Sequence, residues 1–206
     1  MELSKVSEQV SEDTGVNIIV APPTPSISQV CATVKIPVIG QHVDFSRPGS
    51  TTGFLVPEIV KSYGAVGSLI NHSEHRFEST ESIRELVSIL RGLQMVSIVC
   101  VRTPEEAGTI ANYNPDFIAI EPPELIGSGK AVSKENPSIV TRSITAVEEM
   151  SKSSKVICGA GIVDKDDVES ALRLGAQGIL VASGIIKAKS WYDKIQELAL
   201  GFKAQH

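Results

Sequence analysis

Short apolar runs alternate with longer segments of helical periodicity along the whole chain. Runs of this kind suit parallel strands that are buried on both faces. The pattern predicts strands at 17–21, 38–41, 68–71, 97–100, 117–120, 156–158 and 178–181. The chain therefore predicts a parallel sheet whose strands are joined by helices.

The segments between the strands carry helix start and stop signals. Gly15 is placed to cap the opening helix, and residues 103–106 (Thr-Pro-Glu-Glu) form a capping-box pattern with proline at the first helical position. Asn136-Pro137 repeats the device without the glutamate, and Asp164 can cap a later helix. Apolar stripes at helical spacing run through Leu3, Val6 and Val10, through Ile83, Leu86, Val87 and Leu90, through Val168 and Leu172, and through Trp191, Ile195 and Leu198.

Strands that alternate with helices describe either a doubly wound sheet or a closed barrel. Polar and glycine-rich residues follow nearly every predicted strand, which favours a barrel whose βα-loops form one site. We expect one domain, 1–206, with a (β/α)8 TIM barrel that lacks its first β-strand. Seven strands are predicted and a helix precedes the first of them, at 17–21, so an eight-stranded barrel would need one more strand before that helix. The strands near Val20 and Leu180 should then flank a gap, or else pair directly and close a smaller barrel.

Composition excludes several classes of function. The 206 residues carry a net charge of -5, which disfavours a nucleic-acid-binding surface, and no apolar run is long enough to cross a membrane. The three cysteines are scattered and contain no C-x-x-C pair. This usage favours a reducing, cytoplasmic compartment over a disulfide framework or a zinc site, and the polar first residues do not form a secretory signal.

The stretch 117–130 combines a buried strand with an acid at its carboxyl end and a hinged segment after it. Glu121 ends the strand, Pro122-Pro123 stiffen the backbone, and Gly127 and Gly129 loosen it again. This order predicts a general base beneath a closing lid. Glu124 is assigned to the hinge or the surface.

His72 follows another predicted strand. The start of a helical turn at this position would lower the histidine's pKa, and the neutral imidazole could then donate a hydrogen bond to a carbonyl. Two other interpretations stay open: a structural histidine bonded to neighbouring backbone, and a metal pair with His75, for which no further ligand is suitably spaced.

Two glycine-rich segments, 158–162 and 181–184, follow the last two predicted strands. In an eight-stranded barrel these loops commonly form a phosphate cradle of backbone N–H groups. Glycine suits such a cradle because a side chain would keep the backbone away from the anion.

These segments together resemble the triosephosphate isomerase family, and most closely its short archaeal branch. The resemblance rests on Asn-His-Ser-Glu at 71–74, Ile-Glu-Pro-Pro-Glu-Leu-Ile-Gly-Ser-Gly at 120–129, Cys-Gly-Ala-Gly-Ile at 158–162 and Leu-Val-Ala-Ser-Gly at 180–184. Segments 41–44 and 49–53 look like the family's third loop, which packs into a neighbouring subunit.

The resemblance implies Glu121 as proton acceptor, His72 as electrophile and 124–131 as the lid. The phosphate site would be lined by Ile126, Gly161, Ala182 and Ser183. It further implies a phosphorylated triose as substrate and a place in glycolysis and gluconeogenesis. The chain should need neither cofactor nor metal, and should form a cytoplasmic homo-oligomer, either a dimer or a tetramer.

The family's first strand carries an Asn-x-Lys motif that has no counterpart in this sequence, and no other basic residue is placed to substitute for its lysine. We therefore expect the given chain alone to be poorly soluble and nearly inactive. An incomplete or inactive member of the family is the alternative. Another phosphate-binding barrel, such as an aldolase or a ribulose-phosphate epimerase, is a weaker alternative. An aldolase would usually need a Schiff-base lysine at the end of a strand, whereas most lysines here fall in helices and loops.

Overall fold

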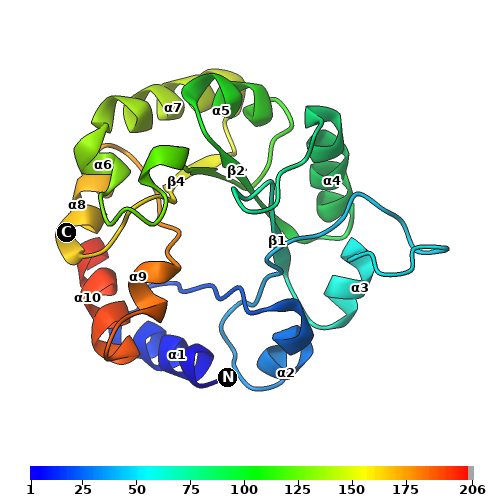
Figure 1. The fold of residues 1–206 in the computed structure, drawn as a ribbon, viewed down its shortest axis with the longest axis horizontal. Coiled ribbons are helices and arrows are strands. Elements are labelled where there is room, and N and C mark those ends of the chain that lie inside the picture. Colours follow the sequence, from blue (N-terminus) through cyan, green and yellow to red (C-terminus); the bar gives the residue numbers. More distant parts are fainter. Residues whose placement is uncertain (204–206) are drawn as a thin grey trace.

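The computed structural model, which describes residues 1–203, shows helices arranged in a ring around a central parallel sheet (Figure 1). The strands are β1 (Gly67–Ile70), β2 (Val96–Val101), β3 (Phe117–Ile120) and β4 (Lys155–Cys158). They pair in the order β1-β2-β3-β4, and every pair is parallel. Crossovers through helices explain this order, since parallel neighbours cannot be joined by tight turns.

The other three predicted strands are present only as single parallel bridges. Val20 pairs with Val38, Gly40 with Ser68, and Cys158 with Ile179. These segments continue the sheet on both sides, so the strand order follows the chain order throughout. The prediction of full strands at 17–21, 38–41 and 178–181 was wrong in length, because each segment pairs through isolated bridges with at most three backbone bonds to any one neighbour.

The helices cover the outer face of the sheet (Figure 1). They are α1 (Glu2–Thr14), α2 (Ile27–Cys31), α3 (Pro57–Ser62), α4 (Thr80–Gly92), α5 (Pro104–Ala111), α6 (Val132–Glu135), α7 (Pro137–Met150), α8 (Lys165–Arg173), α9 (Ser183–Ile186) and α10 (Trp191–Lys203), with 3-10 turns η1 (Thr24–Ser26) and η2 (Pro123–Leu125). None of the helices in residues 1–203 is long and apolar enough to span a membrane.

The helix caps follow the sequence signals in part. Gly15 ends α1 in the left-handed conformation at φ 70°, and Asp164 forms a reciprocal capping box with Asp167 at the start of α8. The predicted box at 103–106 is only half made, because the carboxylate of Glu106 accepts the N–H of Arg102 instead of that of the cap residue. The side chain of Asn136 makes no cap bond to α7.

Alternate residues of the strands point inward and form one inner cluster, and this cluster shows that the sheet curves as in a barrel. This cluster consists of Ile39, Leu69, Ile98, Cys100, Ala119 and Ile157. Ala21 and Leu180, from the two outermost segments, pack against the same cluster. A flat doubly wound sheet would not bring its two edges onto one interior cluster, so the curled arrangement of a barrel is confirmed.

The ring of strands is open between Val20 and Ile179, where residues 1–203 contain no connecting bridge. The ring of helices nevertheless closes there, because α1 packs on α10 through Val10, Ile195 and Ala199 (Figure 1). The described chain thus has the form of an incomplete (β/α)8 barrel, as predicted. The alternative of a smaller closed barrel is not what forms.

Candidate active site

Glu121 lies at the carboxyl end of β3, in the middle of the sheet. Its backbone N–H donates to the carbonyl of Val101 at 2.8 Å, which continues the β2–β3 ladder by one residue. The side chain is 3 % exposed, and Oε2 has no hydrogen-bond partner among the residues that the structure describes. A buried carboxylate oxygen that its surroundings leave unpaired is a common mark of a functional site.

The structure brings His72 to this carboxylate, with Nε2 3.5 Å from Glu121 Oε1. The other ring nitrogen, Nδ1, accepts the backbone N–H of Glu74 at 3.3 Å. An accepting Nδ1 carries no proton, so this contact selects the tautomer with hydrogen on Nε2. The imidazole is therefore oriented to donate from Nε2 into the space in front of Glu121.

The expected lowering of the pKa of His72 was wrong in sign. The hydrogen bond to Glu121 raises the pKa of His72 above its usual value of 6.5, and this outweighs the opposing effect of burial. The expected turn forms, with the N–H of His75 bonded to the carbonyl of His72, but it does not continue into a helix, and α4 begins only at Thr80. The carboxylate of Glu121, and not a helix dipole, therefore has the largest effect on the pKa of His72.

Asn71 holds the turn that carries His72, a role that was not predicted from the sequence. It is buried and has φ 62°, a left-handed conformation that asparagine tolerates better than most residues. Its amide donates to the carbonyl of Cys100 at 2.9 Å, and its Oδ1 accepts the N–H of Phe77 at 3.0 Å. The side chain thus ties both ends of the turn to the end of β2.

Two further residues near the carboxylate were also missed. Cys100 is fully buried, and burial followed by the charge of Glu121 raises its pKa well above the usual value, so the thiol stays protonated. Arg76 lies beside His72 and acts to lower its pKa; it forms an ion pair with Glu106, with Nη1 3.9 Å from Oε1, but its two buried terminal nitrogens have no hydrogen-bond partner in residues 1–203. The proximity of Cys100 to Glu121 could have been found only from the parallel register, which places Cys100 opposite Ala119.

Gly159 makes room for the carboxylate. A Cβ atom at this position would lie 2.7 Å from Cγ and 3.0 Å from Oε1 of Glu121. The glycine after β4 is therefore required by the close approach of Glu121, and not by backbone conformation.

The predicted lid, residues 124–131, is anchored at its ends and exposed in between. Leu125 and Ala131 are buried, whereas residues 126–130 are exposed. Gly127 and Gly129 have φ 68° and 73°, in the left-handed region, and a Cβ on either would meet no atom within 4 Å. A segment with packed ends and an unpacked middle has the construction of a hinged loop.

The four predicted phosphate-site residues are brought together only in part. Gly161 lies against the end of the lid, since a Cβ there would collide with the carbonyl oxygen of Lys130. Ser183 begins the short helix α9 after Ala182, and the next residue, Gly184, packs on the carbonyl of Ile162. Ile126 remains 37 % exposed in the lid.

The structure does not support the alternative of a metal pair formed by His72 and His75. The backbone N–H of His75 donates to the carbonyl of His72 at 2.9 Å, but its ring stacks on His42 and not on His72. The turn between them directs the two side chains to different partners, which sequence spacing alone could not show.

Known proteins of one family are similar to this chain over most of its length. The family model for triosephosphate isomerase matches residues 1–198. The triosephosphate isomerase of Methanocaldococcus jannaschii is 44% identical over 198 residues, which are 96% of this chain and 90% of the relative. That of Methanobacterium bryantii is 46% identical over 188 residues, 91% of this chain and 83% of the relative. That of Cenarchaeum symbiosum is 46% identical over 185 residues, 90% and 82% respectively.

The pairing of His72 with Glu121 leads to a prediction for the titration of the imidazole. Glu121→Gln removes the charge and weakens the hydrogen bond, so the pKa of His72 should fall below its wild-type value, as measured by NMR of the ring C–H signals. A folded-state pKa above the unfolded value of 6.5 means that the pair stabilises the fold at pH below 6.5. This contribution is lost as the pH rises through the folded pKa. An unchanged pKa in the variant would show that the two groups do not interact.

The contact at Gly159 leads to a second prediction. Gly159→Ala should push the Glu121 side chain aside, lower the pKa of His72 toward 6.5 and destabilise the fold by about 1–3 kcal/mol through overpacking. Gly92→Ala is the matched control, because a Cβ there meets nothing within 4 Å. NMR titration and urea unfolding of both variants provide the measurements, and an alanine tolerated equally at the two positions would contradict the close packing.

Proposed function

The chain belongs to the triosephosphate isomerase family, and we propose that it interconverts dihydroxyacetone phosphate and D-glyceraldehyde 3-phosphate with Glu121 as base and His72 as electrophile. The observation that carries this assignment is the buried Glu121 carboxylate, 3.5 Å from Nε2 of His72 at the carboxyl ends of two parallel strands. Such strand ends are where barrel enzymes place their chemistry.

The reaction moves a carbonyl between C1 and C2 of a phosphorylated triose. Glu121 removes a proton from one carbon and returns it to the other, and the two substrate oxygens exchange a proton through the enediolate. No electrons leave the substrate and no atom is lost, so the reaction requires no redox cofactor.

His72 suits the second role because its Nε2 carries the donor hydrogen. Triosephosphate isomerase is itself a well-known case of a carboxylate base beside a neutral histidine, so the pairing follows from the family and is not new. In this chain, the bond from the Glu74 N–H to Nδ1 supports the neutral form. When Glu121 turns to the substrate, the main cause of the raised pKa of His72 is removed.

We assign residues 124–131 to a lid, and Ile126, Gly161, Ala182 and Ser183 to the phosphate site. Closure over the substrate would carry the exposed Ile126 inward, toward the loop that contains Gly161. Excluding water at this step protects the enediolate from elimination of its phosphate.

The setting of this activity is also part of the proposal. Three free cysteines suit a reducing cytoplasm, where glycolysis would supply and consume the trioses. Self-association is supported by the loop before α3, which projects from the ring and exposes Phe45 and Phe54 by 47% and 53% (Figure 1). The relatives all bear the name of the enzyme, which favours an active isomerase over the inactive member.

The base is tested by substitution. In a version of the protein that also carries the family's first strand, Glu121→Gln should lower kcat by about 10²–10⁴-fold, because proton transfer is lost while substrate binding is largely kept. Glu124→Gln is the control: that residue is exposed at the hinge and should leave kcat within a few-fold of the parent's. Triose phosphate interconversion is followed in both directions. Equal activity of Glu121→Gln and the parent would remove Glu121 from the mechanism.

The lid is tested by hydrogen exchange. In the free protein, amides of residues 126–130 should exchange faster than those of β3, because they lie on an exposed segment between buried ends. A phosphorylated carboxylate that mimics the enediolate should slow exchange in this segment, and exposed amides of α4 serve as an internal reference. Exchange that is insensitive to the mimic would argue against closure.

A further inference from the structure

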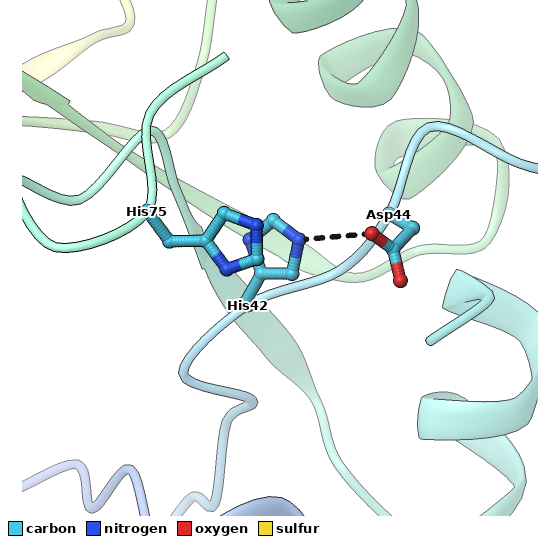
Figure 2. Close-up of side chains that lie close together, drawn as sticks. All are labelled: His42, Asp44 and His75. Carbon is cyan, nitrogen blue, oxygen red and sulfur yellow. Dashed lines mark hydrogen bonds and ion pairs between the residues drawn. The ribbon is translucent and has the colours of Figure 1, made fainter. Parts of the chain in front are cut away.

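Three side chains that take no part in the proposed reaction converge beside the turn that carries His72. His42 and Asp44 come from the segment after the Gly40 bridge, and His75 comes from the turn after β1 (Figure 2). One ligand atom from each residue, an imidazole nitrogen from the two histidines and a carboxylate oxygen from Asp44, lies within 4.8 Å of the other two. Two imidazoles and a carboxylate are a common ligand set for zinc.

The two imidazole rings are stacked, and one of them is bonded to the carboxylate. Their centroids are 3.7 Å apart with an angle of 10° between the ring planes, and Nε2 of His42 lies 3.3 Å from Oδ1 of Asp44 (Figure 2). Phe77 packs against His42, with the ring centroids 5.4 Å apart. The ring of His42 is therefore fixed by aromatic neighbours, while its Nε2 faces the carboxylate.

Asp44 is held in place independently of the histidines. Its Oδ2 accepts the N–H of Leu55 at 2.6 Å, and its own N–H donates to the carbonyl of the same residue at 2.9 Å. These bonds close the loop between residues 44 and 55 and leave Oδ1 directed at His42. A carboxylate whose second oxygen is bonded to the backbone is oriented in the way that metal sites require.

The spacing fits a tetrahedral ion closely for two of the ligands. Zinc lies about 2.0–2.2 Å from nitrogen or oxygen ligands, which places neighbouring ligands of a tetrahedron about 3.3–3.5 Å apart. His42 Nε2 and Asp44 Oδ1 are 3.3 Å apart, which matches this distance between neighbouring ligands. The nitrogen of His75 has to approach by about 1.5 Å at most, and its exposed side chain is free to tilt out of the stack.

We propose that His42, Asp44 and His75 bind one Zn²⁺ ion through two imidazole nitrogens and one carboxylate oxygen. The ion takes the place of the proton shared between His42 and Asp44. The fourth coordination position faces solvent on the side of the exposed His75 and holds a water molecule. The site is distinct from the pair of His72 and Glu121, and does not depend on the isomerase assignment.

The structure favours this set of ligands over the pair that spacing in the sequence suggested. His75 is common to both, but its partner is His42, from a segment more than thirty residues earlier in the printed sequence. Aromatic packing alone would account for the stacked rings. Aromatic packing would not require the Asp44 carboxylate, which two hydrogen bonds between Asp44 and Leu55 hold facing the nitrogen of His42.

The test is titration of the untagged, chelator-treated protein with ZnCl₂ in a calorimeter, together with the visible absorption of the Co²⁺ form. We expect one ion per chain, and Co²⁺ bands of the intensity typical of tetrahedral N/O coordination. His75→Asn should weaken Zn²⁺ binding by about 10–100-fold or more, since it removes a direct ligand. Its exposed position makes misfolding of this variant a minor concern.

Three more variants complete the design. Asp44→Asn should also weaken binding, while its side-chain oxygen can still accept the N–H of Leu55. His72→Asn and His206→Ala are controls that remove the chain's other two histidines, and both should bind Zn²⁺ as the parent does.

Equal affinity of the parent and His75→Asn would overturn the proposal, as would loss of binding in His72→Asn or no binding by the parent. All of these outcomes concern binding and not turnover. An active isomerase that binds no zinc would therefore refute the metal site while leaving the proposed function intact.

Discussion

The proposed active site depends on keeping one carboxylate buried at the end of β3. Taking an ionised carboxylate out of water costs several kcal/mol unless charge or hydrogen bonds compensate. Glu121 receives one such partner, His72 at 3.5 Å, and its second oxygen has none in residues 1–203. The cost must be met by the rest of the fold, and in the proposed mechanism it leaves the base poorly solvated before the substrate arrives.

The parallel sheet is what makes that burial possible. β3 lies between β2 and β4, so the carboxylate emerges where loops from both sides can cover it. Gly159 after β4 clears the space, and Cys100 of β2 contributes a protonated thiol that adds no competing charge. Through their register, the neighbouring strands thus give the carboxylate both space and an uncharged neighbour. The opening between Val20 and Ile179 lies elsewhere in the ring and leaves this arrangement intact.

The sequence predicted most of the framework and the two central side chains, because periodicity and strand ends are local signals. The apolar runs identified every segment of the sheet, and Glu121 and His72 each followed one of them. Features that depend on contacts across the sheet were not predictable. The pKa of His72 reversed its expected direction because its partner, Glu121, lies 49 positions away in the printed sequence. Asn71 and Gly159 likewise have meaning only once β2 and β3 lie beside them.

The turn after β1 shows how one short segment can serve two different environments. His72 points to the buried carboxylate, whereas His75, three residues later, stacks on His42 in an unrelated loop. The two are linked by a single backbone bond, from the N–H of His75 to the carbonyl of His72. Asn71 holds the turn at both ends, through the carbonyl of Cys100 at the end of β2 and through the N–H of Phe77. A ligand on His75 therefore acts within a turn that Asn71 holds at both ends, and the position of His72 is set mainly by the asparagine and by the sheet beneath it.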